Sequence, residues 1–193
     1  MPETDTTTAR NDGTLFEAGD RVGVRFERRL AHSPERVWAA LTEPELLDGW
    51  FPARVEGSFE VGAELRFPFP KGEAPTETGT VTECDRPRLL AYTWGAQLLR
   101  FELEPDGEGT RLRVSHELPR EETAKVAAGW EVKFDELAAV LDGGPRPEFP
   151  EEFWTVLHER YAAEFGVDPE VGRRALEEVK RARAEPEAAE TDV

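Results

Sequence analysis

The side chains suited to acid–base chemistry are few and far apart. The chain has three histidines. His116 alternates with Leu112 and Val114, which predicts that it faces the apolar side of a strand, where it could donate to a ligand carbonyl or exchange a proton. No second catalytic group is tied to it by spacing, and Glu131 and Arg111 would be its partners only if the fold brings them near. A structural, hydrogen-bonded histidine is therefore the favoured interpretation, and we name no catalytic residue.

Tyr92 and Cys84 are the other side chains with a reactive or polar head. A buried Tyr92 hydroxyl needs a hydrogen-bond partner, and a structural partner is favoured over a ligand. Cys84 stands between Glu83 and Asp85, whose charges raise the pKa of a thiol and disfavour a nucleophilic role. Because it is the single cysteine, no intrachain disulfide can form, which fits a reducing compartment.

Metal and cofactor sites have little support in the sequence. The histidines are widely separated and there is one cysteine, so no spacing typical of a metal site occurs. Phosphate-binding loops, dinucleotide-binding fingerprints and nucleophile elbows are also missing. We therefore expect neither a metal nor a cofactor.

Large aromatic side chains recur at positions predicted to face the interior. If the alternation is right, they converge, and they either fill a core or line a cavity for an apolar ligand. Core packing is the favoured interpretation for any single residue, but some of the set are expected to line a cavity. The candidate ligand-binding residues are Trp50, Phe51, Phe67, Phe69, Tyr92, Trp94, Phe101, His116, Trp130 and Phe134.

A long amphipathic helix is predicted over residues 121–141, because apolar residues recur there at steps of three and four. Its apolar positions are Val126, Trp130, Phe134, Leu137, Ala138 and Leu141. Gly143 and Pro145 predict the end of the helix. Gly129 lies inside it, where a glycine costs about 1 kcal/mol relative to alanine, so we expect another group to pack close beside it.

Short alternating segments predict a sheet that covers this helix. A half-buried strand is expected over residues 22–30, although Arg28 falls on its apolar side, and two short helices follow at Ser33-Pro34 and Thr42–Leu47. Further strands are expected at 55–60, 65–69, 79–84, 88–94, 99–103 and 112–116. Tight turns join them, so the sheet is predicted to be antiparallel.

The ends of the chain are expected to lie outside this domain. Residues 1–14 and 185–193 are polar and predicted to be disordered, and residues 15–144 form the domain. Residues 145–184 form a helical extension with an apolar stripe made of Phe153, Trp154, Leu157, Tyr161 and Phe165. Packing of this stripe on its own domain is favoured, and binding of a partner protein is the alternative.

Composition excludes several classes of function. The net charge of −17 would repel nucleic acids and anionic membranes. No run of apolar residues is long enough for a membrane span, and the N-terminus does not resemble a signal peptide. We therefore expect a cytoplasmic protein that does not bind nucleic acid.

The order of these elements resembles the helix-grip (START-like, SRPBCC) superfamily, and within it the branch named after activators of the heat-shock-protein ATPase. The resemblance rests on FERRL (26–30), SPERVWAALTEP (33–44), Trp50-Phe51, DRPRLLAYTW (85–94), Ser115-His116-Glu117 and Gly129-Trp130 with Leu137 and Leu141. It covers about residues 20–143. It implies an α+β fold, like that of the birch-pollen allergen, in which a curved antiparallel sheet grips the long helix around a cavity.

Three functions are compatible with this resemblance. The leading hypothesis is a protein that binds a small apolar or amphipathic molecule in the cavity, without obligatory catalysis. The second is a co-chaperone-like module that binds a protein. The third is an enzyme like the polyketide cyclases or hydrolases, in which His116, Tyr92 or an arginine in the pocket would assist proton transfer.

Overall fold

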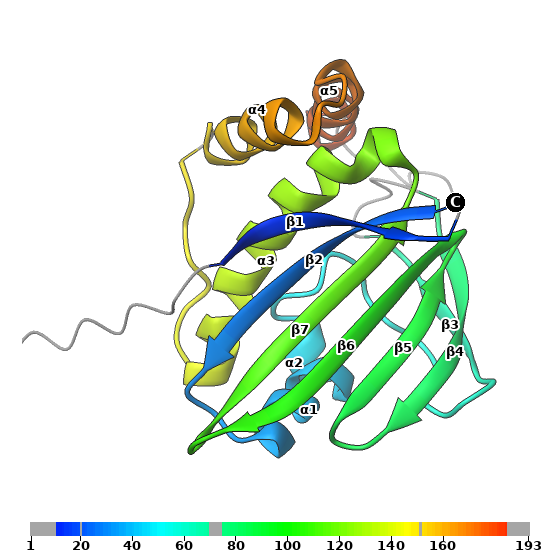
Figure 1. Cartoon of the computed structure of the whole chain (residues 1–193), viewed down its shortest axis with the longest axis vertical. Coiled ribbons are helices and arrows are strands. Elements are labelled where there is room, and N and C mark those ends of the chain that lie inside the picture. Colours follow the sequence, from blue (N-terminus) through cyan, green and yellow to red (C-terminus); the bar gives the residue numbers. More distant parts are fainter. Residues whose placement is uncertain (1–10, 20, 70–74, 151, 185–193) are drawn as a thin grey trace, which may run out of the picture.

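One sheet and one long helix organise the molecule (Figure 1). The computed structural model describes residues 11–19, 21–69, 75–150 and 152–184. The strands are β1 (Asn11–Ala18), β2 (Arg21–Leu30), β3 (Glu64–Phe67), β4 (Glu77–Asp85), β5 (Leu89–Trp94), β6 (Gln97–Asp106) and β7 (Gly109–Leu118). The helices are α1 (Pro34–Thr42), α2 (Pro44–Leu47), the 3-10 turn η2 (Arg120–Glu122), α3 (Thr123–Asp142), α4 (Phe153–Phe165) and α5 (Glu170–Ala184).

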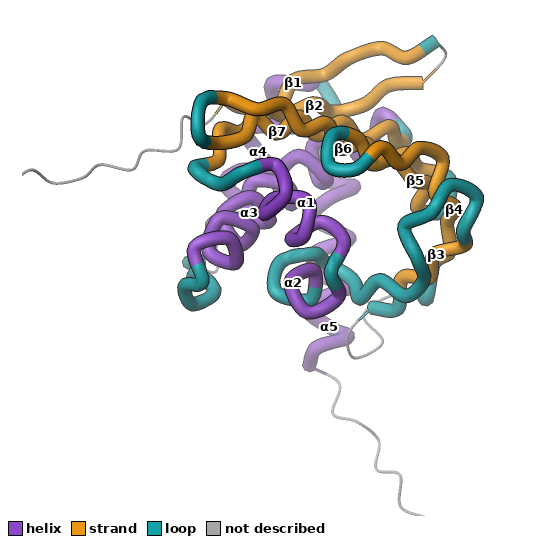
Figure 2. Tube along the Cα trace, turned by 90° about the horizontal axis from the view of Figure 1, so that it is seen from below, coloured by secondary structure: helices purple, strands orange, loops and turns teal. Residues whose placement is uncertain are grey.

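The seven strands form a sheet in the order β1-β2-β7-β6-β5-β4-β3, and every neighbouring pair is antiparallel. Figure 2 shows the sheet bending around the helices, with α1, α2 and α3 on its inner side. The α+β helix-grip architecture expected from the sequence is therefore confirmed. Buried residues alternate strictly along β7, which gives this central strand one apolar face directed at the helices.

Helix α1 begins as the sequence predicts. The Ser33 hydroxyl accepts a hydrogen bond from the Arg36 backbone N–H at 3.3 Å, and Pro34 occupies the first turn. The side chains that α1 buries are Val37, Trp38, Ala40 and Leu41. The indole of Trp50 donates to the Ala40 carbonyl at 2.8 Å, which fixes the segment after α2 against α1.

Helix α3 buries four of the six predicted apolar positions, Trp130, Phe134, Leu137 and Leu141, and ends at the predicted glycine. Gly143 has a φ of 68°, the left-handed conformation that favours glycine at a helix C-terminus. The expectation for Gly129 is wrong, because a Cβ built at this residue would meet no other atom within 4 Å. The predicted start is also slightly early, since Glu121 and Glu122 lie in η2 rather than in the α-helix.

Two local predictions need correction. Residues 11–14 are not disordered, since they belong to β1, an edge strand in which a weak apolar alternation hides the pairing with β2. Residues 55–60 do not form a strand, because their described pairing is the single bridge between Glu56 and Arg66. Residues 1–10 and 185–193, also predicted to be disordered, lie outside the described residues.

The helical extension packs on its own domain, as favoured from the sequence. Figure 1 shows α4 and α5 lying across the end of α3 where that helix begins. Tyr161 and Phe165 are buried. The alternative of a partner-binding stripe is therefore wrong for Tyr161 and Phe165. The other three residues of the stripe, Phe153, Trp154 and Leu157, are half-buried.

Candidate functional site

The ten candidate ligand-binding residues form one series of neighbouring rings between the sheet and α3, here called the interior aromatic cluster. Trp94 and Trp130 are its two centres, because each contacts several other rings. The ring-centroid distances are 5.1 Å (Phe67–Trp94), 5.2 Å (Phe51–Trp94), 6.0 Å (Phe69–Trp94), 6.5 Å (Trp94–His116), 6.1 Å (His116–Trp130), 6.3 Å (Trp50–Trp130), 6.0 Å (Phe101–Trp130), 5.4 Å (Trp130–Phe134) and 5.8 Å (Phe67–Tyr92).

The cluster has a deep end and an end closer to the surface. Trp50 and Phe67 are fully buried, whereas Phe69 and Trp94 are half-buried. Phe69 lies beyond the end of β3, and Trp94 is the last residue of β5. The cluster therefore comes closest to the surface at Phe69 and Trp94.

His116 is held inside the cluster as a neutral imidazole. It is only 4% exposed, and burial lowers its pKa to about 3. The Trp130 indole N–H donates to Nδ1 of His116 at 3.1 Å. Since Nδ1 accepts this bond, the hydrogen of the neutral ring is on Nε2. The Nε2 atom is buried and has no hydrogen-bond partner among the described residues.

Trp94 presents a second buried N–H. Its Nε1 atom is buried and has no hydrogen-bond partner in the described part of the chain. The indole is parallel to the His116 imidazole, with an angle of 8° between the ring planes. Buried polar groups in proteins are usually paired, so two unpaired N–H groups on neighbouring rings require an explanation.

Tyr92 adds a polar group deeper on the same face. Burial raises the pKa of its hydroxyl, so the group stays protonated. Its ring contacts those of Phe67, Phe101 and Phe59. The neutral Tyr92 therefore contributes an apolar wall with one hydroxyl.

A buried ionic network that the sequence did not identify borders the cluster. Arg28 and Glu131 are 3% and 4% exposed and form an ion pair of 2.7 Å. The Tyr161 hydroxyl donates to the other carboxylate oxygen of Glu131 at 2.5 Å and accepts from the Gly13 backbone N–H at 2.9 Å. The Arg28 guanidinium also lies over the Phe134 ring, 4.4 Å from its centroid.

The signal for this network was the position of Arg28 on the apolar side of its predicted strand. A buried arginine needs a buried acid, and Glu131 is the acid on the facing helix. The suggestion that Glu131 and Arg111 could serve His116 is therefore wrong. Glu131 pairs with Arg28, and Arg111 forms ion pairs of 3.8 Å with Glu27 and 3.5 Å with Asp106.

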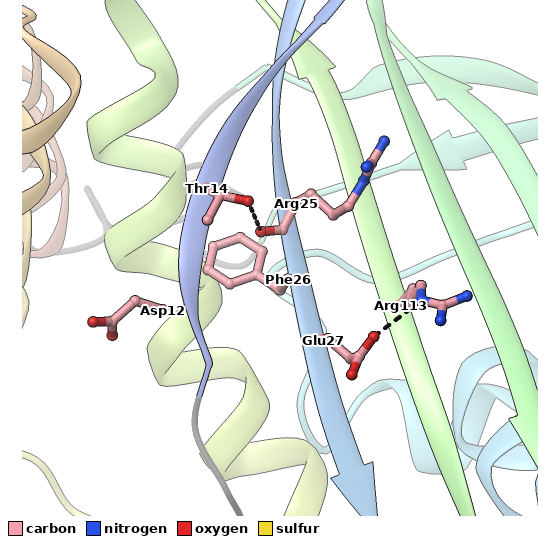
Figure 3. Close-up of a pocket in the computed structure, with 6 residues that line it drawn as sticks. All are labelled: Asp12, Thr14, Arg25, Phe26, Glu27 and Arg113. Carbon is pink, nitrogen blue, oxygen red and sulfur yellow. Dashed lines mark hydrogen bonds and ion pairs between the residues drawn. The ribbon is translucent and has the colours of Figure 1, made fainter. Parts of the chain in front are cut away.

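A separate pocket of about 230 Å³ lies between β1 and β2 (Figure 3). Its lining residues are Asp12, Thr14, Arg25, Phe26, Glu27 and Arg113. Most of its polar groups are already paired, Asp12 with Arg160 and Glu27 with Arg113. This pocket is the weaker candidate, because a ligand would have to compete with these ion pairs.

Other kinds of site have less support. In the described ranges, no group of three or more His, Cys, Asp or Glu side chains is arranged to hold a metal ion. Burial and Asp85 raise the pKa of the Cys84 thiol, which disfavours a reactive thiolate. None of the helices in the described part of the chain is long and apolar enough to cross a membrane.

A curved antiparallel sheet around a long C-terminal helix, with an aromatic interior, defines a helix-grip protein of the SRPBCC (START-like) superfamily. The chain belongs to the family described as "Activator of Hsp90 ATPase homolog 1-like protein", whose model matches residues 31–142, more than half of the sequence. This family match confirms the resemblance seen in the sequence motifs. A search of curated proteins gave no match.

Several solved structures share the fold. CalU16 from Micromonospora echinospora is 24% identical with a TM-score of 0.65, and the match covers 82% of this chain and 98% of CalU16. EF2215 from Enterococcus faecalis, a conserved protein of unknown function, is 25% identical with a TM-score of 0.67, covering 80% of this chain and 90% of that protein. DynU16, from the dynemicin biosynthetic locus, is 24% identical with a TM-score of 0.57, covering 65% and 49%.

Proposed function

We propose that this protein binds a small apolar or amphipathic molecule in the interior aromatic cluster, between the sheet and α3. The observation that carries the proposal is a pair of buried nitrogen atoms, Trp94 Nε1 and His116 Nε2, that have no partner within the described ranges and lie in an otherwise aromatic environment. Ligand sites in proteins combine apolar walls with a few polar groups that orient the ligand. A bound molecule would supply the missing hydrogen-bond partners.

The aromatic composition of the cluster supports the same proposal. Aromatic faces bind apolar molecules by burying a large area, at about 25 cal/mol per Å². Trp94 and Phe69 are half-buried, so the cluster reaches the surface at this end. This binding function requires no proton transfer. We also propose a cytoplasmic location for the protein.

Catalysis by a cyclase- or hydrolase-like mechanism has less support. His116, whose pKa is lowered to about 3, is a poor general base near neutral pH, because the ideal pKa lies close to the working pH. Its Nδ1 is also occupied by the Trp130 indole. Glu131, the buried acid that borders the cluster, is already bonded to Arg28 and Tyr161.

A co-chaperone-like role in protein binding also has less support, although the matching family is named for such an activator. The apolar stripe of the extension was the candidate partner surface. Tyr161 and Phe165 of that stripe are buried in the protein itself. A partner would have to use the remaining half-buried residues or displace α4.

A thermal-shift screen tests the proposal. The protein is melted alone and with each member of a library of small apolar compounds at concentrations well above the expected dissociation constants. A ligand present at 100 times its Kd stabilises the folded state by about 2.7 kcal/mol, so binders raise the melting temperature measurably.

The variant Trp94→Ala tests whether such binding uses the cluster, and Trp154→Ala on α4 is its matched control. We expect Trp94→Ala to lose the ligand-induced shift and Trp154→Ala to retain it. A library without any stabilising compound, or a shift that Trp94→Ala retains in full, would contradict the proposal.

A further inference from the structure

The geometry of the two unpartnered nitrogens points to the chemistry of the ligand. We propose that the ligand is an uncharged, largely apolar molecule with a carbonyl oxygen that accepts hydrogen bonds from Trp94 Nε1 and His116 Nε2. This inference rests on the proposed function, and it adds the polar group and the charge that the site selects.

Both nitrogens are donors. An indole nitrogen always carries its hydrogen and cannot accept. For His116, the Trp130 indole donates to Nδ1 at 3.1 Å, which requires a lone pair on Nδ1 and places the hydrogen of the neutral ring on Nε2. A ligand group that serves both nitrogens must therefore be an acceptor, and a hydroxyl or amine hydrogen would find no partner there.

The two donors, Trp94 and His116, both belong to strands of the same sheet. Trp94 ends β5 and His116 lies on β7, with β6 between them. The rings are parallel to within 8°, and their centroids are 6.5 Å apart. Because an N–H bond lies in the plane of its ring, the two donors act in nearly parallel planes. A carbonyl oxygen placed between these planes has two lone pairs, one for each donor.

The charges at the cluster favour an uncharged ligand over a carboxylate. Arg28 and Glu131, the buried ions that border the cluster, form an ion pair with each other at 2.7 Å. The imidazole of His116 is neutral. A carboxylate placed against these donors would lose its hydration and gain only neutral N–H groups, which is unfavourable in an apolar interior.

A matched set of probes tests this chemistry. 1-Tetralone, tetralin and tetralin-1-carboxylate share one bicyclic skeleton and carry a carbonyl, no polar group and a negative charge, respectively. Affinities are measured by isothermal titration calorimetry with the full chain. Each net hydrogen bond contributes roughly 3- to 10-fold in affinity, so we expect 1-tetralone to bind roughly 10- to 100-fold more tightly than tetralin and more tightly than the carboxylate.

Two further measurements identify the donors. In ¹⁵N-labelled wild-type protein, the Trp94 indole and His116 Nε2 resonances should shift more with 1-tetralone than with tetralin. Trp94→Phe, which keeps a ring but removes the N–H, should reduce the preference for 1-tetralone at least 3-fold and leave tetralin binding nearly unchanged. Trp154→Phe should retain the full preference.

The outcomes separate this inference from the proposed function. Equal affinity for 1-tetralone and tetralin would overturn the inference and leave a purely apolar site in place. Tighter binding of the carboxylate would overturn the assignment of an uncharged ligand. No detectable binding of any of the three probes would count against the inference and the proposed function together.

Discussion

At the scale of single residues, burial of His116 makes stability depend on pH. Burial lowers its pKa to about 3, against 6.5 for the free side chain, so the unfolded chain takes up a proton in this interval and the folded chain does not. The contribution of His116 to the unfolding free energy is therefore fully present above about pH 6.5. It falls by about 1.4 kcal/mol per pH unit as the pH decreases from 6.5 toward 3.

The variant His116→Gln isolates this contribution. Its amide oxygen can still accept from the Trp130 indole, but the side chain does not titrate. Urea unfolding of both proteins at several pH values between about 4 and 7 should give a stability difference that shifts in favour of the variant as pH falls. A stability difference that stays constant with pH would show that folding does not lower the pKa of His116.

The ion pair of Arg28 and Glu131 predicts a second effect at this scale. Arg28→Met leaves the Glu131 carboxylate buried without its cation, which should lower the unfolding free energy by about 3–5 kcal/mol. The double variant with Arg28→Met and Glu131→Met should be clearly more stable than the single one, since no uncompensated charge remains. If the loss of unfolding free energy in the double variant equalled the sum of the losses in the two single variants, this explanation would be contradicted.

At the scale of secondary-structure elements, two glycines inside helices should respond in opposite ways to alanine. A Cβ at Gly129 in α3 would meet open space, so Gly129→Ala should stabilise the protein by about 1 kcal/mol through helix propensity. A Cβ at Gly172 in α5 would overlap the buried ring of His158, so Gly172→Ala should destabilise it by about 1–3 kcal/mol. Urea unfolding measures both changes, and equal signs would contradict the packing described.

Much of the fold could be predicted from periodicity. The spacing of Trp130, Phe134 and Leu137 predicts α3, and the alternation of Leu112, Val114 and His116 predicts β7, because each burial pattern depends on local geometry. β1 escaped prediction because an edge strand with mixed polarity has no clear period. Its position depends on pairing with β2 rather than on its own sequence.

The site was predictable in part. The inner-face aromatic residues follow from the same alternation, so their convergence could be expected. The partners of the polar groups could not, because these are distant in sequence. The Gly13 N–H and the Tyr161 hydroxyl are 148 positions apart, and Arg28 and Glu131 are 103 apart. Only the misfit of Arg28 in its strand indicated that such a partner exists.

At the scale of the whole molecule, the extension is part of the folded unit. The Tyr161 hydroxyl links α4 to Glu131 of α3 and to the Gly13 backbone of β1. The ion pair of Arg146 with the buried Glu136, at 2.8 Å, fixes the connection to α3.

Ending the chain after Gly144 should therefore lower the unfolding free energy by several kcal/mol, since it exposes Glu131 and the apolar surface that Phe165 covers. Chemical denaturation of the full and shortened chains measures the change. Tyr161→Phe should reproduce a part of it, about 1–3 kcal/mol, by removing the hydroxyl alone. A shortened chain of unchanged stability would favour an extension that serves a partner instead.

The measurement that tests the central proposal most directly is native mass spectrometry of the gently purified protein, compared with the same sample after denaturation. We predict a small-molecule adduct of 1:1 stoichiometry that disappears on denaturation and is weakened in Trp94→Ala but not in Trp154→Ala. Only the mass of the free protein, even after incubation with an extract of apolar metabolites, or an adduct indifferent to Trp94, would contradict a ligand site between the sheet and α3.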